Sequence, residues 1–191
     1  FLVAGADISR MPWLGYRKNF PSMKIKQEIK LEYRPTDNAS MEIGYALRYS
    51  EYNGTDGTGM PSKEALETGR LNFVGSFSTE NGLTLKTRVG YKLAKSSGEQ
   101  GVMVLQDINY VAPNIPLSLW FRFGIFNTEG WDSRLYAYEN DLLNSFSVPA
   151  LSGRGTRSYL LVKYGLGRHI EVRVKYGVTT TLAENGQQGS S

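Results

Sequence analysis

Residues that could carry out covalent or metal chemistry are scarce in this sequence of 191 residues. It contains no cysteine, which excludes disulfides, thiolate metal sites and cysteine nucleophiles. Its one histidine, His169, is the only imidazole that a hydrolytic enzyme could use as a general base. Because His169 follows Arg168 at a predicted short turn, we expect a surface histidine there. The sequence therefore predicts no catalytic residue, no cofactor and no metal ion, with an enzyme that uses His169 as the alternative.

Charged side chains are numerous and mixed in sign, with 22 Lys and Arg against 18 Asp and Glu. Acids such as Glu28 and Glu42 could face one another as the two carboxylates of a glycoside hydrolase do, but we expect neighbouring Lys and Arg to balance them. Other basic residues could form positive patches, which would favour anionic solutes or nucleic-acid strands. These candidate basic residues are Arg70, Lys86, Arg88, Lys92, Arg122, Lys163, Arg173 and Lys175.

Residues 127–157 bring aromatic residues, closely spaced acids and an Arg-Gly-rich end into one stretch. Long ordered loops without a fold of their own are often functional. We expect this one to be ordered, with short strands near residues 135–139 and 142–148. Its charges predict a network in which acids pair with arginines, and this network either stabilises the loop or forms a ligand or partner site. The candidate network residues are Asp132, Arg134, Glu139, Asp141, Arg154 and Arg157.

The elements that position these residues are predicted to be strands. In residues 24–34, apolar side chains such as Ile25, Ile29 and Leu31 share one parity, while Lys, Glu and Arg occupy the other. Only a strand places two such sets on opposite faces. The alternation recurs in residues 41–49, 71–77, 83–93, 117–125, 160–164 and 170–176. The run 102–111 is less regular, and Trp120 and Phe126 fall on the opposite parity from Phe121 and Phe123.

The connections between these strands are predicted to alternate in length. Short turns fall at residues 35–40, 79–82, 112–116 and 165–168, and longer excursions at residues 9–23, 50–68, 94–101 and 127–157. Because consecutive connections of a meander lie at opposite ends of the strands, the short turns would share one rim and the long loops the other. Outer-membrane β-barrels have this asymmetry.

Aromatic residues near the strand ends give a second indication. Tyrosine suits the interface between water and lipid, because its ring is apolar and its hydroxyl group seeks a polar partner. We therefore expect one aromatic girdle at each rim. The residues are Tyr33, Phe77, Tyr110 and Tyr164 at the short-turn rim, and Tyr49, Tyr91 and Tyr176 at the loop rim.

The predicted fold is all-β: an antiparallel up-and-down meander forming a transmembrane β-barrel of about nine strands, with the apolar parity toward lipid and the charged parity toward the lumen. Residues 1–191 would be a single barrel region, and residues 127–157 an external or lumen-filling loop. An odd strand count leaves the barrel unclosed, so we expect a missing closing strand and a truncated piece of a larger protein. A soluble ligand-binding β-barrel with an apolar interior is the alternative, because periodicity does not identify the medium on each face.

A family resemblance is carried by the runs WDSRLYAYEND, FSVPA and GRGTRSY within residues 126–159. They resemble the C-terminal barrel region of helix-hairpin-helix (competence-protein-like) proteins of the Bacteroidota, and the resemblance extends over roughly residues 101–176. It implies an outer-membrane barrel of a Gram-negative bacterium, with outer-membrane lipid and other envelope proteins as partners. It links to nucleic acid only through helix-hairpin-helix domains that this chain lacks. We therefore expect a membrane anchor or a transport-related pore or scaffold of a larger protein.

Overall fold

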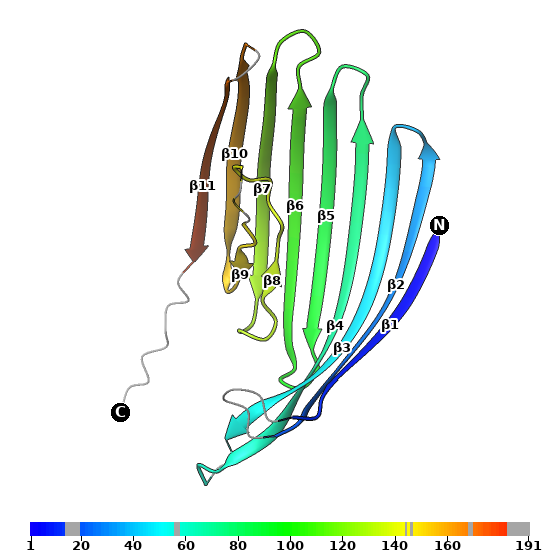
Figure 1. Ribbon diagram of the computed structural model, residues 1–191, viewed down its shortest axis with the longest axis vertical. Helices are drawn as coiled ribbons and strands as arrows, with labels where there is room; N and C mark the ends of the chain where they lie inside the picture. The colour runs from blue at the N-terminus through cyan, green and yellow to red at the C-terminus, as the bar shows by residue number, and fades with distance from the viewer. Residues whose placement is uncertain (14–19, 56–57, 144, 146, 168–169, 183–191) are drawn as a thin grey trace.

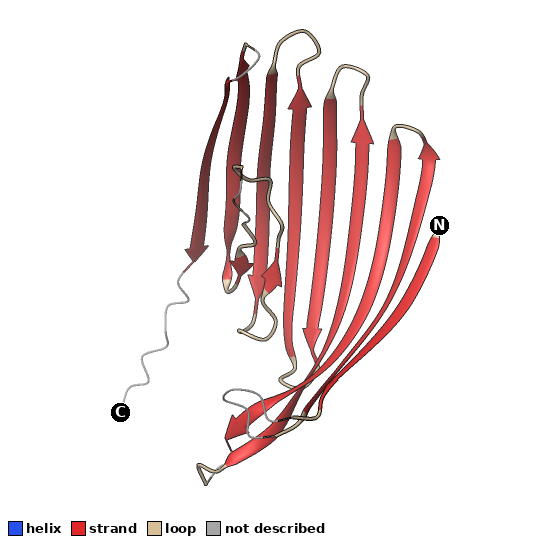
Figure 2. Cartoon of the chain, in the orientation of Figure 1, coloured by secondary structure: helices blue, strands red, loops and turns tan. Residues whose placement is uncertain are grey.

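The computed structural model describes residues 1–13, 20–55, 58–143, 145, 147–167 and 170–182. Within these ranges the chain forms strands and no helix (Figure 2). Nine strands make one antiparallel sheet in the order β1-β2-β3-β4-β5-β6-β7-β10-β11. They are β1 (Leu2–Met11), β2 (Ser22–Thr36), β3 (Ala39–Thr55), β4 (Pro61–Ser78), β5 (Leu83–Ala94), β6 (Glu99–Val111), β7 (Leu117–Thr128), β10 (Arg154–Leu166) and β11 (Ile170–Leu182). The predicted all-β, up-and-down meander is confirmed.

The sheet is open and curved, with β1 and β11 at its two edges (Figure 1). Every neighbouring pair of strands in it is antiparallel. Between β7 and β10 the chain leaves the sheet. Residues 129–153, here called the inserted segment, form a second, two-stranded sheet from β8 (Leu135–Tyr136) and β9 (Ala150–Leu151).

One face of the sheet is apolar and exposed across the strands. Directly opposed residues on neighbouring strands share a face, so the register lines up whole rows of side chains. One row runs Phe77, Leu85, Ile108, Phe121, Leu160 and Tyr176 from β4 to β11, and a second runs Leu31, Ile43, Phe73, Val89, Val104 and Ile125 from β2 to β7. Most of these side chains are exposed. We call this surface the apolar face, and the opposite one the polar face.

The hydrophobic core cluster lies on the polar face, beneath the inserted segment. Met103 and Leu105 of β6 and Phe126 of β7 pack with Leu135 and Leu151 of the inserted segment in one hydrophobic cluster. Figure 1 shows β8 and β9 against the C-terminal half of the sheet. These contacts explain the irregular parity of residues 102–111 and the displaced Phe126, because apolar side chains are needed on the polar face wherever the inserted segment covers it.

The approach of the inserted segment to the sheet also depends on glycine. A Cβ atom at Gly101 would overlap the carbonyl oxygen of Ser133, and one at Gly124 would overlap the side chain of Leu105. Glycine at position 101 therefore leaves room for the backbone of the inserted segment at Ser133, and glycine at position 124 leaves room for the side chain of Leu105, which packs in the hydrophobic cluster.

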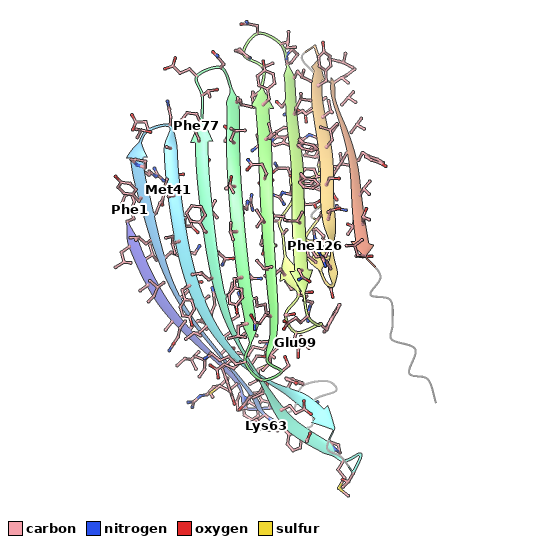
Figure 3. The ribbon with its side chains drawn as sticks, turned by 180° about the vertical axis from the view of Figure 1, so that it is seen from behind. Phe1, Met41, Lys63, Phe77, Glu99 and Phe126 are labelled. Atoms are coloured by element: carbon pink, nitrogen blue, oxygen red, sulfur yellow. The ribbon has the colours of Figure 1, made fainter. Side chains whose placement is uncertain are left out.

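The predicted turns at residues 35–40, 79–82 and 112–116 are confirmed, whereas several of the predicted loops are not. The fourth predicted turn, residues 165–168, includes residue 168, which lies outside the described residues. Much of residues 50–68 is strand: β3 pairs with β4 from Thr55 and Pro61 inward, and this hairpin projects beyond β2 and β5. In Figure 3, Lys63 lies on that projection, at the opposite end of the sheet from Met41 and Phe77. Residues 95–98 form only a tight turn. The asymmetry between the two rims therefore depends on the projecting β3–β4 hairpin and on the inserted segment. Of the loop expected at residues 9–23, residues 14–19 lie outside the described residues.

Two expectations for residues 127–157 also need correction. The second short strand lies at Ala150–Leu151, whereas the described residues among 142–148 form no strand, and residues 154–157 belong to β10. The sequence placed these residues in a loop because Gly153 and Gly155 suggested turns. In the sheet, Gly155 instead lies beneath Phe126 and against the backbone of Thr180, where a Cβ atom would overlap the carbonyl oxygen of that threonine.

Candidate functional site

A buried ion pair joins β6 and β7 beneath the inserted segment. Asp107 and Arg122 are direct cross-strand partners and are 3% and 1% exposed. Arg122 donates from Nε to Oδ1 of Asp107 and from Nη2 to Oδ2 of the same carboxylate, the latter at 2.9 Å. Its Nη1 donates to the carbonyl oxygen of Tyr138 at 2.6 Å, and Arg88 of β5 approaches Asp107 at 3.2 Å. The guanidinium group of Arg122 thus links Asp107 of the neighbouring strand β6 to the backbone of the inserted segment.

A second ion cluster ties the inserted segment to the last two strands of the sheet. Arg157 of β10 donates to both carboxylate oxygens of Glu139, at 2.8 and 2.9 Å. Lys175 of β11 lies 3.1 Å from Glu139 and 3.3 Å from Asp141. The side chain of Glu139 is completely buried. It is therefore held by two cations from two different strands.

These contacts shift the acids of the inserted segment toward the charged form. Burial alone would raise the pKa of Glu139, but the hydrogen bonds from Arg157 and Lys175 outweigh it and leave that pKa below its usual value. The pKa of Asp141 falls to about 2 because Ser147, the backbone N–H of Leu142 and Lys175 stabilise its carboxylate. Both acids are consequently ionised near neutral pH.

Tyr159 connects the two clusters. Its side chain, on the polar face of β10, is buried, with Arg122 at 5.4 Å and Lys175 at 5.1 Å from the ring centroid. Cations this close to an aromatic ring are attracted to its face. The Tyr159 hydroxyl accepts a hydrogen bond from the backbone N–H of Asn140 at 3.2 Å. We call the two clusters together with Tyr159 the ionic clamp.

Comparison with protein-family models, curated proteins and solved structures finds no match. The resemblance noted from the sequence motifs therefore stays a prediction. No helix in the described part of the chain is long and apolar enough to span a bilayer.

The structure brings only part of the predicted loop network together. Arg157 binds Glu139 as expected, and Asp141 pairs with Lys175 rather than with an arginine. Arg134 instead donates to the carbonyl oxygen of Trp131 and stacks on its ring at 4.3 Å.

The two remaining residues of that network take no part in the ionic clamp. The backbone N–H of Asp132, not its carboxylate, is anchored, donating to Glu99 Oε2 at 2.9 Å. Arg154 begins β10 and is exposed. Among the ion pairs of the described residues, none includes Arg154 or Asp132.

The candidate basic residues all lie on the polar face, where they fall into three groups. Arg88, Arg122 and Lys175 belong to the ionic clamp. Lys163 and Arg173 both pair with Glu171, at 2.7 and 2.6 Å. The third group is Arg70, Lys86 and Lys92, and in the described part of the chain no acid lies within ion-pair distance of them.

The other chemical candidates can also be placed. Glu28 and Glu42 are not cross-strand partners: each has its own lysine, Lys26 at 2.5 Å and Lys30 at 3.8 Å. Within the described ranges, no three His, Cys, Asp or Glu side chains gather as they would to hold a metal ion. His169 lies outside the described residues.

Sequence reasoning missed Asp107 and Tyr159, although both carry a recognisable signal. Each occupies the polar parity of a strand whose other parity is apolar, and Tyr159 is a large aromatic residue at such a position. An aromatic side chain on a polar parity indicates a covered patch. The partners of Tyr159 come from the inserted segment and from two other strands, β7 and β11, so the sequence alone did not identify them.

The ionic clamp is suited to holding a segment in place rather than to catalysis. Its three acids, Asp107, Glu139 and Asp141, are each bound to at least one cation. Removing one partner of such a buried pair leaves an uncompensated charge and costs about 3–5 kcal/mol. The clamp therefore gives the inserted segment a single docked position on the polar face.

Proposed function

We propose that this sheet is the wall of an outer-membrane β-barrel, with the apolar face against lipid and the polar face lining the lumen. In this proposal it serves as a membrane anchor or transport-related scaffold of a larger protein. The observation that carries the proposal is the exposed apolar face, on which two rows of large side chains cross six strands each. A row between them contains Thr87 and Gln106, which hydrogen-bond to each other. Exposed apolar surface of that extent is typical of proteins that contact a membrane or a partner.

The dimensions of the sheet support this proposal. On β5, Leu83 lies opposite Tyr110 of β6. From Leu83 to Tyr91 the strand rises by eight residues, or about 26 Å. Tilting the strands by roughly 40° would reduce this to about 20 Å across the bilayer, close to the apolar band of roughly 25 Å on known barrels. Tyr33, Phe77 and Tyr164 are exposed near the short-turn ends of their strands, and Tyr91 is exposed near the other end of β5. Tyr176, expected at the loop rim, lies instead in the middle of β11.

The position of the inserted segment also supports the proposal. In a soluble barrel with an apolar interior, buried side chains would gather on the apolar face. Here the buried cluster and the ionic clamp lie on the polar face, where the inserted segment covers β6, β7 and β10. That arrangement fits a lumen partly filled by a loop.

The open edges indicate how a barrel would be completed. Strands β1 and β11 each have one neighbour in the sheet, and unpaired backbone donors and acceptors are costly in hydrocarbon. In the proposal both edges therefore pair with further strands, so that no edge faces lipid.

A charge placed on the apolar face tests the proposal. Ile43→Arg should prevent the protein from partitioning with the membrane fraction, or should lower the free energy of unfolding in vesicles by about 2–4 kcal/mol, because a charge near the bilayer centre is poorly solvated. The matched control is Asn72→Arg, whose site lies on the polar face of the neighbouring strand β4. If Ile43→Arg has no more effect than this control, the apolar face does not contact lipid.

A further inference from the structure

A pocket of about 280 Å³ lies between the polar face of β3, β4 and β5 and the inserted segment. Two tyrosines of the inserted segment, Tyr136 and Tyr138, line one side, and Arg48, Arg70 and Lys92 of the three strands line the other together with Thr68. This pocket is separate from the ionic clamp, whose cations Arg88, Arg122, Arg157 and Lys175 do not line it.

The cations of this pocket repel one another and lack acidic partners. Arg70 and Lys92 are direct cross-strand partners, an arrangement that destabilises a sheet when both side chains carry the same charge. No ion pair of the described residues includes Arg48, Arg70 or Lys92. Lys92 donates instead to the carbonyl oxygen of Arg134 at 3.3 Å, and Arg134 adds a further positive charge nearby.

The excess of positive charge is local to this pocket. Elsewhere on the polar face, most of the candidate basic residues lie against acids: Arg88 and Arg122 against Asp107, and Lys163 and Arg173 against Glu171. Lys86 is the exception among them. Among the described residues, no acid lies within ion-pair distance of Lys92, while the like charges of Arg134 and Arg70 act on it. A bound anion would supply the missing negative charge.

We propose that this pocket binds a soluble phosphate monoester, with the phosphoryl group at Arg70 and Lys92 and the organic part against Tyr136 and Tyr138. A phosphoryl dianion matches several clustered cations better than a single carboxylate does, and a guanidinium group binds phosphate oxygens through two parallel hydrogen bonds. The volume is near the lower end of the roughly 300–1,000 Å³ typical of small-molecule sites. The pocket opens on the polar face, away from the apolar face, so a soluble ester fits better than a lipid headgroup.

This inference goes beyond the proposed barrel, because the pocket exists whichever medium contacts the apolar face. It is tested by isothermal titration calorimetry on the protein in detergent, with glucose 6-phosphate as the probe and glucose and inorganic phosphate as comparisons. We expect glucose 6-phosphate to bind, inorganic phosphate to bind more weakly, and glucose not to bind. Binding should weaken as salt is added, since the contacts are ionic.

Two substitutions locate the site. Arg70→Gln should weaken the binding of glucose 6-phosphate at least tenfold, whereas the control Arg173→Gln, on the same face but beside Glu171, should leave it within twofold. Arg70→Gln also removes a like-charge contact, so the free variant should unfold at the same temperature or a higher one, and loss of binding then does not reflect loss of folding. Inorganic phosphate should raise the unfolding temperature of the unmodified protein but not that of Arg70→Gln.

Three results would overturn the proposal. The first is no binding of glucose 6-phosphate or of inorganic phosphate at millimolar concentration. The second is an affinity of Arg70→Gln for glucose 6-phosphate equal to that of the unmodified protein. The third is a loss of affinity in Arg173→Gln as large as in Arg70→Gln, which would indicate only diffuse attraction to a basic face. A fourth arm uses short-chain phosphatidic acid: if it binds while glucose 6-phosphate does not, the ligand is a lipid headgroup and the soluble ester is wrong. None of these outcomes depends on whether the sheet spans a membrane.

Discussion

Replacing Asp107 by alanine gives the sharpest test of the ionic clamp. Among the described residues, Asp107 is the one acid within ion-pair distance of Arg122, a side chain that is 1% exposed. Once Asp107 is replaced, Arg122 keeps its hydrogen bond to the carbonyl oxygen of Tyr138, but no other described acid lies within ion-pair distance of it or of Arg88. Leaving a buried charge uncompensated costs about 3–5 kcal/mol. We expect Asp107→Ala to lower the free energy of unfolding by that amount.

Urea unfolding in detergent micelles would measure this loss, with Glu171→Ala as the matched control. Glu171 also binds two cations, Lys163 and Arg173, but its side chain is 40% exposed, so its removal should cost less than about 1 kcal/mol. The double variant Asp107→Leu with Arg122→Met removes both charges and should recover most of the stability. If Asp107→Ala and Glu171→Ala cost the same, the buried pair does not hold the inserted segment as we infer.

Three further predictions concern the docking of the inserted segment. The pKa values of Glu139 and Asp141 are lowered in the folded protein, the latter to about 2. The two acids therefore stabilise the fold fully at a pH above their unfolded-state pKa values, and this stabilisation is lost as the pH falls through their folded-state pKa values. Proteolysis of the inserted segment should accelerate between about pH 4 and pH 2. Gly101→Val should lower the free energy of unfolding by about 1–3 kcal/mol by overpacking and increase hydrogen exchange in the segment. Leu135→Ala should cost about 2–5 kcal/mol in urea unfolding, whereas Leu143→Ala, at an exposed position, should change stability by less than about 0.5 kcal/mol.

The strands could be predicted from the sequence because alternation is a local property. The parity of Ile29, Leu31 and their neighbours was enough to assign a strand, and each short turn lay where the alternation stopped. The β3–β4 hairpin was underestimated: residues 50–68 were expected to be a loop, whereas their extended pairing is set by the partner strand. Strand ends of this kind depend on tertiary contacts that a single strand does not encode.

The candidate site could be predicted only where both partners lie in one stretch of sequence. Glu139 and Arg157 were placed in one network because they lie in the same stretch. Lys175 was named as a basic residue but not as the partner of Asp141, since the pairing of β10 with β11 brings it there. Asp107 was overlooked because its partners come from other strands. The parity exceptions at Phe126 and Tyr159 were the available signal of a covered face.

The central claim, that the apolar face contacts lipid, is tested most directly by spin labels on single cysteines, which the cysteine-free sequence permits without background. Labels would replace Ile43, Val104 and Leu160 on the apolar face and Asn72 and Ser76 on the polar face of the protein in phospholipid vesicles. The account predicts that the first three collide mainly with oxygen dissolved in lipid, and the last two mainly with a water-soluble nickel complex. If the labels at Ile43, Val104 and Leu160 collide mainly with the nickel complex, or with neither reagent, the apolar face does not contact lipid.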